Sequence, residues 1–422
     1  MIEIINDKLF IDQIPARTLA EKYGTPLFVL SEDSIIEKCQ ELRSSFLNKY
    51  TNTRVAYAGK AFLTLAMCKI VEREGFHLDV VSGGELYTAI KADFPPDRIE
   101  FNGNNKSPEE LQMAIDYGVG RIIIDGFDEL SLINQCALTE KINVVLRISP
   151  GVDSHTHEYV TTGNLDSKFG IPIQDHRLEL LINQLLESKV VNLMGFHFHV
   201  GSQINENVSH LLATKILMEK VKEFKEKFDY IPAEINVGGG FGVRYTDEDH
   251  AKSYSYFLDP IMEIINAAFV ELNSPKPTVV IEPGRSIIAN AGVTLYTVGA
   301  IKDIPGIRKY VSVDGGMTDN PRPALYNSKY DCFIENDQVG QELITVCGKC
   351  CESGDILLTD VMTKPASRGD LLAIFSTGAY CYAMSSNYNK IPFLPIVLTS
   401  DGKERLIVKR QTFDELISRE LF

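Results

Sequence analysis

The sequence predicts an α/β barrel joined to a second, antiparallel β-domain, and three features of the 422-residue chain carry this prediction. Between residues 54 and 284, eight short β-rich runs alternate with helix-like stretches, a number and order typical of a closed (β/α)₈, TIM-like barrel. After residue 285, strand-like runs follow one another without long helical patterns between them. The first thirty residues also contain strand-like runs, IEIINDKLFIDQIP and TPLFVLS, which we expect to pair with the C-terminal sheet.

The β-rich runs are bounded by turn residues, and helix signals lie between them. In SPEELQMAIDYG (107–118), Ser107 is a typical N-cap, Pro108 suits the first helical position and a glycine closes the helix. We therefore place the barrel at residues 31–284 and the β-domain at 1–30 and 285–422. The eight predicted strands are RVAYAG (54–59), HLDVVS (77–82), IEFNG (99–103), RIIIDG (121–126), NVVLRIS (143–149), LMGFHFHVG (193–201), EINVGG (234–239) and TVVIEPG (278–284).

Composition excludes several classes of partner. With 57 acidic against 42 basic residues, the net charge of −15 offers no field for nucleic acid or an anionic membrane. No run approaches the roughly 20 consecutive apolar residues that span a bilayer, and the N-terminus has no signal-peptide pattern. Eight scattered cysteines in such a chain are typical of reduced thiols, so we expect a cytoplasmic protein.

Polar residues gather where the predicted barrel strands end, which is where barrel enzymes carry their active sites. Gly238, Gly239 and Gly240 follow the seventh strand, and glycines let backbone N–H groups converge on a phosphate. Glu282 and Arg285 follow the eighth strand, and Lys60 ends the first. A lysine there can hold an aldehyde, although this residue alone does not distinguish it from a surface lysine.

His197 and His199 alternate with aromatics in the sixth strand, so both side chains point the same way. This arrangement would suit a metal, but we find no carboxylate nearby to complete the ligand set and predict no metal. Phosphate-binding glycines, a strand-end lysine, a histidine and a strand-end glutamate together indicate pyridoxal 5'-phosphate. In such a site a glutamate keeps the pyridine nitrogen protonated, so that the ring accepts electrons from the substrate's α-carbon.

The chain resembles the fold-type III (alanine racemase-like) pyridoxal-phosphate-dependent decarboxylases, and within them the diaminopimelate decarboxylases. The resemblance covers essentially the whole chain. Its motifs are YAGKAF, GVDSHTHEYVTTGNLDSKFG, HFHVGSQI, GGGFGVRY, EPGRSIIANAG, VDGGMTDNPRPALY, CCESGD and GAYCYAMSSNYN. Many members share the lysine and EPGR segments, whereas DSKFG and the last three motifs are more specific to the diaminopimelate enzymes.

The resemblance implies a role for each matched residue. Lys60 matches the Schiff-base lysine and Cys351 the proton donor; His199 matches the histidine that stacks on the cofactor ring. Phe62 departs from the asparagine of many relatives, which puts only local packing in doubt. The cofactor-binding positions are Lys60, His199, Ser202, Gly238, Gly239, Gly240, Glu282, Pro283, Gly284, Arg285 and Tyr380, and the substrate-binding positions are Arg285, Arg322, Tyr326, Glu352 and Tyr380.

The implied reaction converts meso-2,6-diaminopimelate to L-lysine and carbon dioxide, the last step of lysine biosynthesis. The resemblance also implies a homodimer in which the CESGD loop enters the partner's active site. Two alternatives remain open: a decarboxylase of the same fold that acts on arginine, ornithine or carboxynorspermidine, and a non-catalytic pyridoxal-phosphate-binding protein.

Three cysteines in ITVCGKCCESGD allow three interpretations: half a zinc site, a redox pair, or part of an active site. A zinc site needs a second ligand pair, and a redox pair is expected at a helix start rather than among strands. We therefore expect Cys347 and Cys350 to be packed strand residues. Cys351 directly precedes Glu352 and falls on the proton-donor position of the family, so the resemblance implies that it alone of the three is catalytic.

Overall fold

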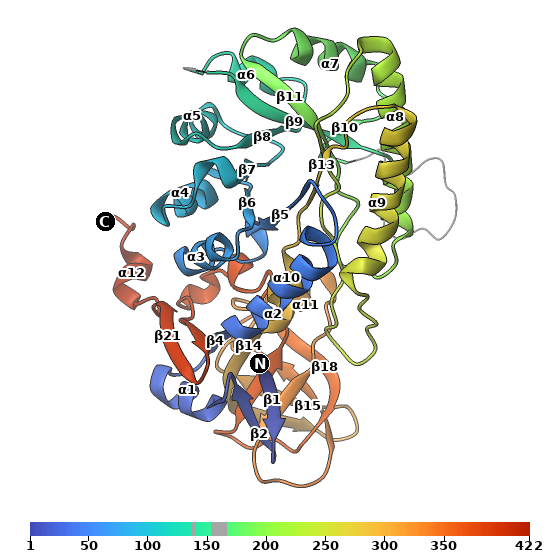
Figure 1. The fold of residues 1–422 in the computed structure, drawn as a ribbon. Helices are drawn as coiled ribbons and strands as arrows, with labels where there is room; N and C mark the ends of the chain where they lie inside the picture. Colours follow the sequence, from blue (N-terminus) through green and yellow to red (C-terminus); the bar gives the residue numbers. More distant parts are fainter. Residues whose placement is uncertain (137–139, 153–166) are drawn as a thin grey trace. The chain divides into compact units, whose positions relative to one another are not determined.

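The computed structural model describes residues 1–136, 140–152 and 167–422 (Figure 1). They form two compact units. One consists of residues 39–242 and 251–286 and contains the barrel; the other consists of residues 1–38, 243–250 and 287–422 and is rich in antiparallel strands. Among the described residues, no helix is both long enough and apolar enough to cross a membrane.

The barrel unit has the eight predicted parallel strands, and β8 pairs with β9 to close the ring. A short ninth strand, β10 (Ile171–Pro172), adds to β9 outside the ring. The predicted barrel is thus confirmed. Its strands, in chain order, are β5 (Thr53–Ala58), β6 (His77–Val80), β7 (Ile99–Phe101), β8 (Arg121–Ile124), β9 (Ile142–Ser149), β11 (Val191–His197), β12 (Glu234–Asn236) and β13 (Thr278–Ile281).

Helices follow the barrel strands and cover them on the outside (Figure 1). The strands are buried on both faces, which explains their continuous apolar sequences such as Ile122–Ile124. In α5, Ser107 caps the helix, Pro108 starts it and Gly118 ends it, as predicted. The structure adds a capping box between Ser107 and Glu110 and a left-handed conformation at Gly118. The helices are α3 (Leu65–Arg73), α4 (Gly83–Lys91), α5 (Pro108–Tyr117), α6 (Glu129–Ile133), α7 (Arg177–Glu187), α8 (Val208–Phe228) and α9 (Tyr254–Glu271).

A buried charged cluster fills the barrel where its strands begin. Arg54 Nη1 and Arg121 Nε each lie 2.7 Å from Glu234 Oε2. Arg54 is also 3.5 Å from Glu100 Oε1. Burial and the neighbouring Glu234 raise the pKa of Glu100 to about 8. Both guanidinium groups thus pair with Glu234, whereas Glu100 Oε1 has only the longer contact to Arg54 and no hydrogen bond among the described residues. We call these four residues the strand-start cluster.

The β-rich unit confirms the second domain, although parallel pairs also occur in it. Its long strand β14 (Gly292–Ile304) pairs antiparallel with β4, β15 and β19, whereas β15 pairs parallel with β17. The remaining strands are β15 (Arg308–Val313), β16 (Cys332–Glu335), β17 (Glu342–Cys347), β18 (Ile356–Thr363), β19 (Leu371–Phe375), β20 (Ile396–Ser400) and β21 (Lys403–Val408), and the helices are α1 (Ala16–Tyr23), α11 (Arg322–Tyr326) and α12 (Phe413–Ile417). Two further helices, α2 (Glu32–Leu42) and α10 (Arg285–Ile288), contain residues of both units.

The N-terminal strands divide in two. Strand β4 (Leu27–Ser31) lies between β14 and β20, so its predicted pairing with the C-terminal sheet is confirmed. The expectation is wrong for β1 (Ile2–Ile5), β2 (Lys8–Ile11) and β3 (Ile14–Pro15), which form their own sheet. The reason is local: Asn6–Asp7 and Asp12–Gln13 have positive φ, the backbone of tight two-residue hairpins, so each strand pairs with its neighbour.

Residues 243–250 group with the β-rich unit, whereas the boundaries 31–284 place them in the barrel. Asn290 Nδ2 donates to the Arg244 carbonyl over 2.6 Å. The Tyr245 ring meets Tyr330 edge to face at 5.2 Å between centroids. These contacts give the short segment its packing partners.

Candidate active site

A cavity of about 520 Å³ opens at the carboxyl ends of the barrel strands. It brings together Lys60, His199 and Glu282, three of the residues predicted to bind the cofactor. We call this cavity the barrel pocket. Its other polar lining residues are Asp79, Asn102, Asn104, Arg147, Ser149, Ser167 and His197.

Lys60 stands on the short 3₁₀ turn Gly59–Ala61 that follows β5, and its side chain is exposed in the open cavity. The backbone here is tightly packed. A Cβ on Gly284 would come within 3.0 Å of Ala58 and Ala61, so the EPG turn after β13 must be narrow. Close packing of these two turns fixes the base of the lysine side chain.

Asp79 lies beside Lys60 on the pocket wall and was missed from the sequence. It is buried, and its Oδ1 has no hydrogen-bond partner in the part of the chain that the structure describes. Burial and the nearby Glu282 raise its pKa well above the usual range. The sequence feature that could have indicated Asp79 is an aspartate inside the apolar strand HLDVV, because a charged side chain buried there needs a partner.

Glu282 is held from two sides. His197 Nε2 lies 3.1 Å from its Oε2, and Asn236 Nδ2 donates to its Oε1 over 2.8 Å. Burial acts to raise the pKa of Glu282, but His197, Lys60 and His199 lower it to about 2. The expectation that no carboxylate lies near the two histidines is therefore wrong, because Glu282 reaches His197 from another strand. Within the described residues, no group of three metal-binding side chains forms.

Asn236 is fully buried and uses both ends of its carboxamide. Besides its bond to Glu282, its Oδ1 accepts from Gly238 N over 2.9 Å, and its Nδ2 lies 3.3 Å from Glu100 Oε2. One side chain thus fixes Glu282, the start of the glycine segment and a member of the strand-start cluster. Its role was also missed, because Glu282 and Glu100 are distant from it in sequence.

The glycine segment tolerates no side chain. A Cβ would lie 2.5 Å from the Phe198 carbonyl at Gly238, 2.1 Å from the Glu282 carbonyl at Gly239 and 2.3 Å from the Gly201 carbonyl at Gly240. Gly238 and Gly240 also have φ of +68° and +94°. The segment does not line the barrel pocket itself, but Gly239 N lies 3.3 Å from His199 Nδ1, which does.

Ser202 and Arg285 complete the predicted phosphate-binding end. Arg285 Nη2 donates to Ser202 Oγ over 2.9 Å. A hydroxyl, a guanidinium and a glycine backbone are donors that suit a phosphate. Desolvation and the nearby Lys60 lower the pKa of His199 well below the usual range, so its ring is neutral and suits stacking. These residues fit pyridoxal phosphate.

The predicted substrate residues of the β-rich unit form a separate group. The Arg322 guanidinium lies over the rings of Tyr326, at 5.1 Å, and Tyr380, at 5.4 Å. Tyr380 has a φ of +61°, which is uncommon for a non-glycine residue. Such a strained backbone at a predicted binding residue is typical of functional sites.

The CESGD loop presents Cys351 and Glu352 at the surface of this unit. Asp355 organises the loop from inside: its carboxylate accepts from Cys350 N over 2.8 Å and from Met317 N over 2.6 Å. Cys351 N donates to Asn389 Oδ1 over 2.7 Å. The loop backbone is therefore fixed while both candidate side chains remain exposed.

The other two cysteines differ from each other. Cys347 ends β17, as predicted, and its Sγ lies 3.4 Å from Ser312 Oγ. Cys350 is buried but lies in a bend after the strand, so its strand assignment is wrong. The reason is Asp355, which captures the Cys350 N–H that a strand would use for pairing. All eight cysteines are free thiols.

Comparison with known proteins agrees with this geometry. Residues 32–289 match the family described as pyridoxal-dependent decarboxylase, pyridoxal binding domain. The chain is 44% identical to a diaminopimelate decarboxylase of Bacillus subtilis (strain 168), covering 98% of this chain and 95% of that protein. It is 42% identical to one of Staphylococcus aureus (strain COL), covering 98% and 97%.

A solved structure is similar over the full length of the chain. The crystal structure of diaminopimelate decarboxylase from M. jannaschii in co-complex with L-lysine superimposes with a TM-score of 0.94 at 35% identity. The match covers 100% of this chain and 98% of that chain. From the barrel pocket, the family match and these near full-length relatives, we conclude that the chain belongs to the diaminopimelate decarboxylases, a group of pyridoxal-phosphate-dependent decarboxylases.

Proposed function

We propose that this chain converts meso-2,6-diaminopimelate to L-lysine and carbon dioxide, with pyridoxal phosphate as cofactor. The observation that carries the proposal is the grouping of Lys60, His199 and Glu282 around one pocket at the carboxyl ends of a parallel barrel. Membership of the diaminopimelate decarboxylases names the substrate.

Residues of the barrel unit would hold the cofactor. The Lys60 amine would bind its aldehyde, His199 would lie against its ring, and Ser202, Gly238–Gly240 and Arg285 would donate to its phosphate; Tyr380, of the β-rich unit, is a further proposed contact. Pro283 and Gly284 form the narrow turn that places Glu282. When bound, pyridoxal phosphate supplies the electron sink that lets an amino acid lose its α-carboxylate.

Glu282 would hold the proton on the pyridine nitrogen of the bound cofactor. Its pKa of about 2 keeps it ionised at neutral pH, so it would accept that N–H without taking the proton. His197 and Asn236 fix both carboxylate oxygens, and the acceptor therefore needs no reorganisation. An ionised, oriented carboxylate is what keeps the ring electron-deficient.

The remaining groups recognise the substrate and return a proton to it. Arg285 and Arg322 pair with the distal carboxylate, Glu352 with the distal ammonium, and Tyr326 and Tyr380 line the same end. Cys351 Sγ returns a proton to the α-carbon. Ornithine, which lacks the distal carboxylate, would leave the arginines unpaired and is therefore a poor substrate. We place the enzyme in the cytoplasm as a homodimer whose CESGD loop serves the partner's site.

Carbon dioxide release tests the reaction. The purified protein, loaded with pyridoxal phosphate, is offered meso-diaminopimelate, arginine, ornithine and carboxynorspermidine. We expect release from diaminopimelate alone. Release mainly from another amino acid would favour a related decarboxylase, and a bound cofactor without release would favour a non-catalytic binding protein.

Subunit exchange tests the shared site. If Lys60 and Cys351 of one site come from different chains, mixing inactive Lys60→Ala and Cys351→Ala proteins restores activity. Random exchange makes half of the dimers mixed, each with one intact site of two, so recovery approaches about a quarter of wild type. Labelled wild-type chains measure the exchange. Demonstrated exchange without recovered activity contradicts the shared site.

A further inference from the structure

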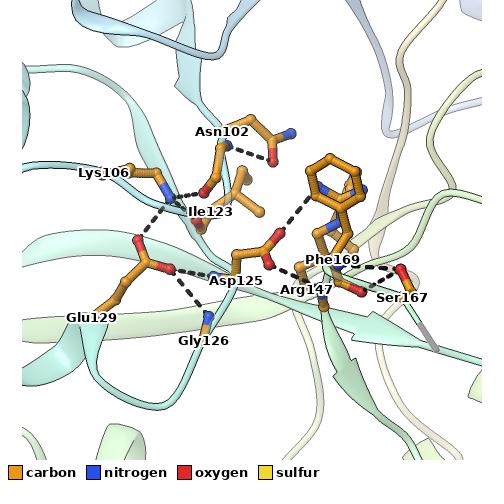
Figure 2. Close-up of polar contacts among 12 residues, drawn as sticks. Asn102, Lys106, Ile123, Asp125, Gly126, Glu129, Arg147, Ser167 and Phe169 are labelled. Carbon is orange, nitrogen blue, oxygen red and sulfur yellow. Dashed lines mark hydrogen bonds and ion pairs between the residues drawn. The ribbon is translucent and has the colours of Figure 1, made fainter. Parts of the chain in front are cut away.

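Asp125, directly after β8, joins two segments that are distant in sequence (Figure 2). Its carboxylate accepts from Arg147 Nη1 over 3.1 Å and from Gly170 N over 2.9 Å. These partners are 22 and 45 positions away. Asp125 is only 5% exposed, so its interactions are little screened by water.

The two segments that Asp125 joins form part of the pocket wall. Arg147 in β9 and Phe169 both line the barrel pocket, whereas Asp125 does not. The Arg147 guanidinium lies 4.5 Å from the centroid of the Phe169 ring, within the range of a cation–π interaction (Figure 2). Asp125 therefore orders a cation and an aromatic ring that face the pocket without facing it itself.

A second layer fixes the position of Asp125. The Glu129 carboxylate accepts from the backbone N–H groups of Asp125 and Gly126. Lys106 Nζ, also buried, lies 2.7 Å from Glu129 Oε1 and donates to the carbonyls of Gly103, over 2.7 Å, and Ile123, over 2.6 Å (Figure 2). The network ties the ends of β7 and β8 together, which fixes the backbone from which the Asp125 side chain projects.

Charge balance in the pocket suggests what the ordered cation does. Asp79 and Glu282 place carboxyl groups on the wall, and the substrate must bring the carboxylate that it loses. Among the described lining residues, the basic side chains are Lys60 and Arg147, besides the two histidines. Lys60 is assigned to the cofactor, so Arg147 is left to offset the incoming carboxylate.

We propose that Asp125 is a positioning residue that holds Arg147 at the pocket wall as the cation that receives the substrate's α-carboxylate, the group that leaves as carbon dioxide. The proposal deepens the proposed function and rests on it. Arg147 would bind this carboxylate in the ground state. Misalignment of the Arg147 guanidinium should therefore weaken substrate binding rather than slow the chemical step.

The Asp125→Asn variant tests the alignment. The amide keeps the size of the side chain but loses its charge and one of two equivalent acceptors, so it cannot hold Arg147 and Gly170 N equally. We expect KM for diaminopimelate to rise about tenfold while kcat changes less than about twofold. Inhibition by L-lysine, which lacks the leaving carboxylate, and the absorbance titration with pyridoxal phosphate stay unchanged.

A double-mutant cycle separates this role from a general effect on folding. Arg147→Met removes the cation and should raise KM at least as much, whereas Arg147→Lys keeps a charge and loses less. If Asp125 acts through Arg147, the double variant Asp125→Asn/Arg147→Met is no worse than Arg147→Met alone. Additive losses overturn the proposal, and Arg147→Met and Arg147→Lys test it even if Asp125→Asn does not fold.

Asp175 provides the matched control in the same unit. Its carboxylate accepts from Arg177 Nη2 over 2.6 Å, and Arg177 lies 4.4 Å from the Phe127 ring centroid, but none of the three lines the pocket. Asp175→Asn should leave KM unchanged. An equal rise in both variants, a loss confined to kcat, or weakened L-lysine inhibition in Asp125→Asn overturns the inference. Wild type that releases no carbon dioxide from diaminopimelate contradicts the proposed function instead.

Discussion

The barrel contains two charged clusters, one where its strands begin and one where they end. The carboxyl groups of the two clusters differ in the partners that they find within the chain. In the strand-start cluster, Glu234 is bracketed by Arg54 and Arg121 at 2.7 Å. In the barrel pocket, Asp79 Oδ1 has no hydrogen-bond partner among the described residues. Glu100 Oε1 in the strand-start cluster also lacks a hydrogen bond among the described residues, so the difference lies in the ion pairs: Glu234 has two cations at 2.7 Å, whereas Asp79 forms no ion pair in the described part of the chain.

This difference separates stability from function within one fold. Charges that are paired internally hold the strand starts together, whereas groups left with unmet polar atoms in a cavity await a ligand. The same division is general in barrel enzymes, whose active sites lie at the carboxyl ends. Substitutions at the two ends should therefore have different readouts.

The largest expected effect is at the pocket. Lys60→Ala should abolish turnover and remove the visible absorbance of the bound cofactor, because no other described lysine lines the pocket to hold the aldehyde. The free energy of unfolding of the apoprotein should stay the same, since the side chain is exposed. Retention of both activity and absorbance would remove Lys60 from its assigned role.

At the opposite end, Glu234→Gln should act on stability alone. It leaves two partly buried guanidinium groups without their carboxylate partner at 2.7 Å, which costs about 3 kcal/mol, the lower end of the range for a buried pair. Urea unfolding measures the loss, while KM of the folded variant stays at the wild-type value. Glu223→Gln, which disrupts an exposed pair with Lys220, is the control and should cost less than about 1 kcal/mol. A similar loss of unfolding free energy in Glu234→Gln and Glu223→Gln would contradict a structural role of the strand-start cluster.

Glu282→Gln should reduce turnover by about a hundredfold, on the order of 3 kcal/mol in the barrier. A neutral amide cannot keep the ring proton, so the electron sink weakens. Cofactor affinity, measured by absorbance titration, should fall much less than kcat. Equal losses in both quantities would make Glu282 a simple binding residue.

His77 gives the strand starts a pH dependence. Burial, together with Arg54 and Arg121, lowers its pKa from 6.5 to about 3. Between these values the unfolded chain binds a proton that the folded chain does not, so stability falls as the pH drops from about 6.5 towards 3. His77→Asn should reduce this slope by up to about 1.4 kcal/mol per pH unit. Urea unfolding at several pH values measures it, and identical slopes would show that His77 does not titrate differently in the two states.

The smallest effects are expected in the β-rich unit. Cys347→Ser and Cys350→Ser should each cost at most about 1–2 kcal/mol, since both thiols pack among neighbouring residues. Thermal unfolding measures the change. Metal analysis of the purified wild type should find no stoichiometric zinc, and a one-to-one content would contradict this prediction.

Sequence patterns predicted the features that depend on local order. The eight barrel strands appear within a few residues of their expected positions because alternation of strands and helices is a local signal. The same counting placed Lys60, His199 and Glu282 at strand ends, where they meet in one cavity.

The features that sequence missed depend on contacts between distant residues. His197 and Glu282 are 85 positions apart, and Asp125 reaches Gly170 across 45. No local pattern indicates such a partner. The strand prediction for Cys350 was wrong for a related reason. Its backbone N–H donates to the Asp355 carboxylate, and this side-chain hydrogen bond outweighs the strand propensity of the neighbouring residues.

Asn236 joins the two ends of the barrel, because its carboxamide nitrogen touches both Glu282 and Glu100. With a pKa of about 8, Glu100 exchanges its proton near neutrality. Protonation of Glu100 changes the acceptor that it offers to Asn236 Nδ2 where the strands begin. The same Nδ2 group donates to Glu282 at the carboxyl ends of the strands. One carboxamide therefore connects the Glu100 carboxyl group, where the strands begin, with the Glu282 carboxylate in the barrel pocket.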